Sequence, residues 1–341
     1  MWTSVFLGRR VAHRFRLPTD QSSRPRRRYG AASTRRTSRA PRHVPSGPVC
    51  RLRAPSQQRD TELHQGGCCR GRRDFKGVLS LWKLSAGDAP ERYYLEQVAQ
   101  GQEDYYAGDG EAPGQWAGSG AGALGVGGRV EDHELKRLLQ ARDPSTGEQL
   151  RRPIRDGAIA GFDLTFRAPK SVSILWGAGQ ADIAHEVREA HDRAVERALG
   201  YLEREACLAR RGHGGREHVR GDGFVAAAFR HRASRASDPL LHTHVVVGNL
   251  TRGPDGRWTA LDGRLLYRHA KTAGVLYQAE LRGELVRRLG VEFGPVEHGC
   301  GDLTGVRREV IEHFSQRRAE IVEHMDAHGG RSAKAAQVAA L

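Results

Sequence analysis

The sequence contains little cysteine, few aromatic residues and no long hydrophobic run. Aromatic residues make up 6% of its 341 residues, and five cysteines occur without any C-x-x-C pair. So few cysteines argue against a disulfide framework and fit a reducing cytoplasm. No apolar run reaches 18 residues, so we expect no membrane-spanning helix. No G-x-x-x-x-G-K-[ST] motif occurs, which excludes a P-loop nucleotide site. The cysteines are Cys50, Cys68, Cys69, Cys207 and Cys300.

Acidic residues are scarce at the start of the chain. Residues 1–77 contain 18 Arg and one Lys against four acidic residues, which accounts for the whole net charge of +15. This leader has no apolar periodicity, so we expect it to be disordered. Three interpretations remain open: a basic arm that binds DNA phosphates, an Arg-rich transit peptide, or a start codon assigned too far upstream. Residues 78–341 carry 36 basic and 36 acidic residues and are electrically balanced.

The balanced part mixes helical and strand patterns without a regular β-α-β rhythm. This mixture predicts an α+β fold with an antiparallel sheet. A histidine-bearing strand lies at residues 240–247, and a Gly- and Pro-containing turn follows it at residues 251–258. The other predicted strands are residues 78–84, a strand within 159–167, and 223–231. The predicted helices are residues 131–142, 181–209, 273–289 and 306–328.

The stretch LLHTHVVVGNL places His242 and His244 at alternate positions of a β-type run. Alternate residues of a strand point to one face, so the two imidazoles project together. A lone pair of this kind also fits a half-buried strand whose histidines bond to backbone or water. His231 ends the preceding strand, and an antiparallel pairing would bring it beside the other two. Three imidazoles with open positions describe a catalytic metal site that can accept a phosphate oxygen.

The histidine set, the stretch GFDLTFRAPKSVS and two Tyr-Tyr pairs together resemble the relaxase domain of the TraI/TrwC type (MobF). These are conjugative DNA-nicking enzymes of the HUH endonuclease superfamily, and the similarity covers residues 78–341. The resemblance implies an antiparallel β-sheet palm with flanking helices, and a divalent metal ion, Mg²⁺ or Mn²⁺, bound by His231, His242 and His244. It also implies nicking of single-stranded origin-of-transfer DNA by a tyrosine, a 5′-phosphotyrosine adduct, and rejoining during plasmid mobilisation.

The resemblance assigns roles to five further residues. Tyr93 corresponds to the first nucleophile, and Asp163 to a general base or a residue that orients a histidine. Tyr94 completes the first pair, and Tyr105 and Tyr106 form a second pair that serves a later strand transfer. The spacing between the pairs is longer than in the plasmid members, which leaves their division of labour open. A Tyr-Tyr pair also fits the packing face of an amphipathic helix.

The resemblance also sets expectations about partners and alternatives. Single-stranded or hairpin origin DNA is the expected partner in a bacterial cytoplasm, without membrane insertion, and relaxosome accessory and coupling proteins are further candidates. The family usually continues into a helicase, and the final residues read as an unfinished helix, so we expect a relaxase module or a truncated chain. The alternatives are an origin-binding module without productive transfer and a rolling-circle replication initiator.

Several other polar residues have weaker signals. Lys170 could contact a phosphate or cap the Pro169 turn, and Asn249 is expected to form an Asx turn. A basic set could line a DNA groove or form a solvated face: Arg264, Arg268 and Lys271. Five histidines show no ligand spacing with respect to the trio and are expected at the surface: His185, His191, His213, His218 and His269.

Overall fold

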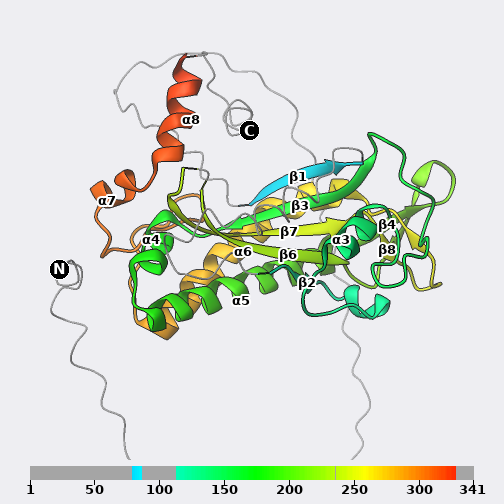
Figure 1. The fold of residues 1–341 in the computed structure, drawn as a ribbon, viewed down its shortest axis with the longest axis horizontal. Coiled ribbons are helices and arrows are strands. Elements are labelled where there is room, and N and C mark those ends of the chain that lie inside the picture. The colour runs from blue at the N-terminus through cyan, green and yellow to red at the C-terminus, as the bar shows by residue number, and fades with distance from the viewer. Residues whose placement is uncertain (1–78, 87–112, 235, 328–341) are drawn as a thin grey trace, which may run out of the picture. The chain divides into compact units, whose positions relative to one another are not determined.

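The computed structural model describes residues 79–86, 113–234 and 236–327. The predicted leader, residues 1–77, lies outside them. The described part is built around a five-stranded antiparallel sheet in the order β1-β3-β7-β6-β2 (Figure 1). The predicted α+β class with an antiparallel sheet is therefore confirmed. The strands are β1 (Ser80–Ser85), β2 (Gln115–Ala117), β3 (Ile159–Arg167), β6 (Ala226–Ala233) and β7 (Pro239–Gly248).

One face of the sheet packs against two long antiparallel helices, α5 (Ala181–Ala206) and α6 (Gly263–Leu289) (Figure 1). Strand alternation explains the division between the faces. Phe162, Leu164 and Phe166 of β3 enter the core under these helices, whereas the residues between them point to the other face. The core on the helix side also includes Leu241, Val245 and Val247 of β7.

Among the described elements, helix α3 (Asp132–Leu139) packs on the opposite face. Gly161 and Gly248 are paired across β3 and β7, and they allow this close packing. A Cβ atom at Gly248 would lie 2.7 Å from Leu138 Cδ1, and one at Gly161 would lie 2.9 Å from Leu139 Cδ2. Gly248 lies at the end of β7 remote from His242, and Gly161 is its partner on β3, so α3 packs on the half of the face that lacks histidines.

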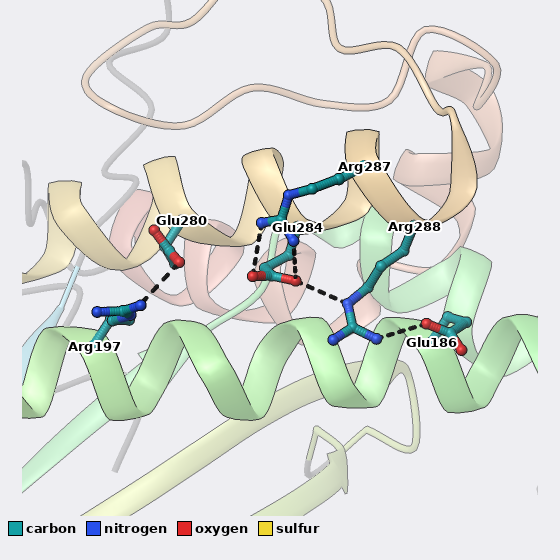
Figure 2. Close-up of polar contacts among 6 residues, drawn as sticks. All are labelled: Glu186, Arg197, Glu280, Glu284, Arg287 and Arg288. Carbon is teal, nitrogen blue, oxygen red and sulfur yellow. Dashed lines mark hydrogen bonds and ion pairs between the residues drawn. The ribbon is translucent and has the colours of Figure 1, made fainter. Parts of the chain in front are cut away.

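A ladder of ion pairs joins α5 to α6. Arg288 Nη1 lies 2.7 Å from Glu186 of α5 and its Nε lies 2.8 Å from Glu284 of α6. The side chain of Glu284 is 4% exposed, and hydrogen bonds from Arg287 and Arg288 lower its pKa to about 2. This carboxylate therefore stays ionised and keeps both arginines in place. Figure 2 shows the residues of the ladder: Glu186, Arg197, Glu280, Glu284, Arg287 and Arg288.

The remaining elements lie around this frame. They are α4 (Lys170–Ala178), α7 (Arg308–His313), α8 (Gln316–Ala327), two short 3₁₀ helices, η1 (Ala121–Leu124) and η2 (His213–Gly215), and two hairpins. The hairpins pair β4 (Leu208–Arg211) with β5 (Glu217–Arg220), and β8 (Thr251–Arg252) with β9 (Trp258–Thr259). Within the described ranges, no helix has both the length and the apolar composition needed to cross a bilayer.

Some predicted boundaries were wrong. The helix predicted at 273–289 begins ten residues earlier, because Asp262 accepts a hydrogen bond from the backbone of Arg264 and caps it. The helix predicted at 181–209 ends at Ala206, where the chain enters β4. The helix predicted at 306–328 is two helices, α7 and α8, and the predicted turn at 251–258 is flanked by β8 and β9.

Candidate metal centre

Three histidines meet on the face of the sheet opposite α5 and α6. In the pairing of β6 with β7, His231 lies directly opposite His242, and Phe229 lies opposite His244. The three rings have centroid separations of 5.1–5.2 Å. One nitrogen from each ring lies within 4.8 Å of the others. The antiparallel approach of His231 to His242 and His244 is therefore confirmed, and the trio forms a candidate metal site.

Hydrogen bonds fix the orientation of two of the rings. His244 Nδ1 lies 2.8 Å from an oxygen of buried Asp163, and Thr165 Oγ1 lies 3.3 Å from the same nitrogen. His242 Nδ1 donates to the carbonyl of Leu240 at 2.8 Å. A carboxylate and a carbonyl both accept, so each Nδ1 carries a proton and Nε2 is the nitrogen left to bind a metal ion. This is the tautomer that a metal-binding imidazole requires.

The electrostatics of the trio also suit a cation. Burial lowers the pKa of His231 to about 3, with a further contribution from His244. Burial and the two neighbouring imidazoles lower the pKa of His242 well below its ordinary value. Both rings are thus neutral at pH 7. Among the described residues, the buried Nε2 atom of His231 has no hydrogen-bond partner. Such an atom costs roughly 1–3 kcal/mol, and a bound cation would remove that cost.

The alternation of β3 places a row of polar residues on the histidine face. Asp163 lies opposite Val246, Thr165 opposite His244, and Arg167 opposite His242. The sequence indicated Asp163 through the family resemblance but gave no role to Thr165 or Arg167. The sequence could have indicated Thr165 and Arg167, because residues two and four positions after Asp163 in a strand share its face.

The four predicted tyrosines lie outside the described residues: Tyr93, Tyr94, Tyr105 and Tyr106. The described ends of their segment are Ala86, which follows β1, and Pro113, which precedes β2. These strands are the two edges of the sheet. A Cβ atom at Gly114 would lie 2.4 Å from the ring of Phe229, the residue opposite His244. The chain therefore enters β2 beside the histidine cluster.

The expectation that His191 is a surface residue is wrong. His191 lies on α5 and is fully buried, with its Nδ1 2.8 Å from Tyr277 Oη and its Nε2 2.7 Å from Thr243 Oγ1. Thr243 is the residue between His242 and His244, and it points to the helix face. Burial lowers the pKa of His191 to about 3, so the ring is neutral. It connects α5 and α6 to the back of the histidine strand.

Other residues with weak signals make structural contacts. The Nζ atom of Lys170 donates to the carbonyl of Pro239 at 2.9 Å and joins α4 to the start of β7. Asn249 does not form the expected Asx turn, because its side chain bridges the carbonyl of Ile159 and the backbone N–H of Leu261. Arg264 pairs with Asp262 at 2.8 Å.

The remaining predicted surface positions differ in burial. Arg268 and Lys271 are exposed on α6. His269 is half-buried, with its Nδ1 2.9 Å from Tyr201 Oη. Three of the five histidines expected at the surface are exposed: His185, His213 and His218.

Comparisons with known proteins give a consistent result. A family model described as TrwC relaxase matches residues 87–341. The multifunctional conjugation protein TraI of Escherichia coli is 36% identical over 279 residues, which cover 77% of this chain and 15% of TraI. A metal-bound structure of the conjugative relaxase TrwC with OriT DNA has a TM-score of 0.66 at 35% identity, over 77% of this chain and 89% of that one. TrwC complexed with a 27-mer DNA comprising the recognition hairpin and the cleavage site has a TM-score of 0.63 at 34% identity, with the same coverage.

Proposed function

The chain belongs to the TrwC relaxase family, and from this membership we propose that it nicks and rejoins one strand of origin-of-transfer DNA. The observation that carries the proposal is the cluster of His231, His242 and His244 on one face of a relaxase-like sheet. Solved TrwC structures contain OriT DNA, which supports the same class of partner for this chain. The chain spans 15% of the length of TraI, so further activities of TraI are not transferred to it.

We assign the three histidines as ligands of a divalent cation, Mg²⁺ or Mn²⁺. A cation bound there would neutralise negative charge that develops on the scissile phosphate. Asp163 acts as a positioning residue, because it is buried and its carboxylate accepts from His244 Nδ1. This contact sets the ring orientation and favours the orienting role over that of a general base.

The nucleophile is a tyrosine oxygen. It attacks phosphorus, forms a phosphotyrosine ester with the 5′ phosphate, and displaces the 3′ oxygen, which leaves with a proton as a free hydroxyl. An unperturbed tyrosine has a pKa of about 10, so the phenol needs a base or a nearby cation to react at neutral pH. The ester preserves the energy of the broken bond, so a later attack by a 3′ hydroxyl rejoins the strand without a nucleotide cofactor.

Both tyrosine pairs lie in the segment that joins β1 to β2. Tyr93 follows Ala86 by seven residues, and Tyr106 precedes Pro113 by seven residues. We propose that Tyr93 attacks first and that Tyr105 serves the second transfer, with Tyr94 and Tyr106 as the second members of the pairs.

The test is capture of the covalent adduct. Wild-type protein, Mg²⁺ or Mn²⁺ and 3′-labelled single-stranded origin DNA should give a protein-linked band. Tyr93→Phe removes the attacking oxygen and should give no adduct, whereas Tyr105→Phe should give the first adduct but transfer the strand poorly. Binding of uncleaved DNA should change by less than about tenfold, or roughly 1.4 kcal/mol, in either variant.

Mass spectrometry of the trapped peptide identifies the nucleophile. DNA carried by Tyr105 or Tyr106 at the first cleavage would reverse our assignment of the pairs. Cleavage without any tyrosine adduct would indicate hydrolysis by water and would contradict the relaxase mechanism. Binding without cleavage by the wild-type protein would favour an origin-binding module instead.

A further inference from the structure

Trp82 is a large aromatic side chain on the histidine face of β1. In the pairing of β1 with β3, Ser80 lies opposite Thr165 and Trp82 lies directly opposite Asp163. Directly opposed residues of an antiparallel pair share a face, with Cβ atoms about 4.5–5.5 Å apart. The carboxylate of Asp163 in turn contacts His244 Nδ1 at 2.8 Å. Trp82 is therefore next to the residue that orients a ring of the histidine cluster.

The surroundings of Trp82 differ from those of other apolar residues on β1. Leu81 packs on the core beneath α5 and α6, and Leu84 belongs to the cluster under α3. Trp82 is half-buried, and it belongs to none of the three hydrophobic clusters in the described part of the chain. Since β1 forms one edge of the sheet, part of this aromatic surface is accessible at that edge (Figure 1).

The charge beside Trp82 favours an uncharged partner. Asp163 is buried, and a carboxylate at this place repels a phosphate group. A nucleobase carries no such charge, and its aromatic face can stack on an indole. The positive charge that a metal ion would bring lies on the far side of Asp163, at the three histidines. The arrangement therefore separates a place for a phosphate from a place for a base.

The distance between these two places corresponds to a few nucleotides. One strand, β3, separates β1 from β7, which carries His242 and His244. Neighbouring strands are about 4.8 Å apart, so the backbones of β1 and β7 lie roughly 10 Å from each other. A stacked strand of DNA advances about 3.4 Å per nucleotide. A base at Trp82 would thus lie no more than about three nucleotides from a phosphate at the histidine cluster.

We propose that Trp82 stacks on a base of the DNA strand within about three nucleotides of the scissile phosphate. The inference rests on the proposed function for the identity of the strand. Every base has an aromatic face, so stacking on Trp82 contributes affinity and fixes the path of the strand without reading its sequence.

The first experiment measures indole fluorescence in EDTA, so that it depends on neither metal nor cleavage. The probe is a 20-mer of thymidylate. A stacked base quenches an indole, so the emission of wild-type protein should fall as the probe saturates it. Trp82→Phe removes the indole, keeps an aromatic ring and should lose most of this fall. The matched control is Trp176→Phe, at a half-buried tryptophan of α4 that packs on the helix-side core, and it should keep the fall seen in wild type.

The second experiment locates the base. Single abasic sites replace each of the three nucleotides on either side of the scissile phosphate in an oligonucleotide that wild-type protein cleaves, and binding is measured in EDTA. One of them should weaken wild-type binding at least about fivefold, because it removes one stacked base. The same abasic site should leave binding by Trp82→Leu unchanged, whereas Trp176→Leu should show the wild-type penalty. Each penalty compares two oligonucleotides on one protein, so a lower stability of a variant does not change it.

An unchanged fall in emission for Trp82→Phe would overturn the proposal, as would the absence of any fall in wild type. Equal abasic penalties in wild type and Trp82→Leu would also overturn it. None of these results would affect the adduct formed by wild-type protein, which tests the proposed function separately. If wild-type protein forms no adduct, the proposed function fails and the thymidylate measurement still decides whether Trp82 stacks on a base. If Trp82→Leu does not fold by circular dichroism, the emission of Trp82→Phe supplies the decision.

Discussion

Successive residues of β7 face two different environments. Leu241, Val245 and Val247 point toward α5 and α6 and are fully buried in an apolar core. His242 and His244 point the other way, each 8% exposed, toward Asp163, Thr165 and His231. Side chains one residue apart on the same strand thus belong to different networks. The contrast implies that stability and the proposed nicking activity can be perturbed separately in this chain.

The largest effect should come from the histidine face. His242→Ala removes one of three candidate ligands, and we expect adduct formation to fall by about a thousandfold or more. Affinity for uncleaved DNA should change little, because affinity comes mostly from phosphate and base contacts elsewhere. Adduct yield and anisotropy titration measure the two quantities. Full nicking with metal still bound would contradict the ligand assignment.

The helix face should respond in the opposite way. Phe166 is fully buried, and its ring centroid lies 5.5 Å from that of Tyr277. Phe166→Ala should lower the free energy of unfolding by about 3–5 kcal/mol, because it removes apolar area and leaves a cavity. The folded fraction should still form the adduct at a rate close to wild type at low temperature. Denaturant titration and the adduct assay check both points, and a large loss of activity per folded molecule would show that the two faces are coupled.

The sequence predicted the histidine face of β7, because that face follows from local periodicity. Alternation in residues 240–247 and the short connection back to His231 were enough to bring the three histidines together. β2 and the hairpin of β4 and β5 were not predicted, because strands of three or four residues are too short to show periodicity of their own. Their pairing is supplied by distant segments, such as the contact of β2 with β6.

The burial of His191 was missed for a different reason. It was judged by its distance in sequence from the other histidines, although it lies four residues from both Val187 and Val195, which are buried on α5. The helical period therefore placed His191 on the apolar stripe. The sequence could not show that Tyr277 and Thr243 would satisfy both ring nitrogens, since these partners lie 86 and 52 residues away.

The smallest effect concerns this buried histidine and the pH dependence of stability. The folded pKa of His191 is about 3, against an ordinary value of 6.5. Between these values the unfolded chain binds a proton that the folded chain does not. The contribution of His191 to the free energy of unfolding is therefore complete above pH 6.5. It is lost as the pH falls, by about 1.4 kcal/mol per pH unit. At pH 5 the loss attributable to His191 is about 2 kcal/mol.

His191→Gln removes the titrating ring while its amide can still bond to Thr243 and Tyr277. From pH 8 to pH 5 the free energy of unfolding should fall in both proteins. The fall should be about 2 kcal/mol smaller in His191→Gln than in wild type. Denaturant titrations in EDTA at the two pH values give this difference, and the buried imidazoles of His231 and His242 contribute equally to both proteins. His185→Gln, at an exposed position of the same helix, should show the acid sensitivity of wild type. If His191→Gln is as acid-sensitive as wild type, then protonation of His191 does not cause the loss of stability at low pH.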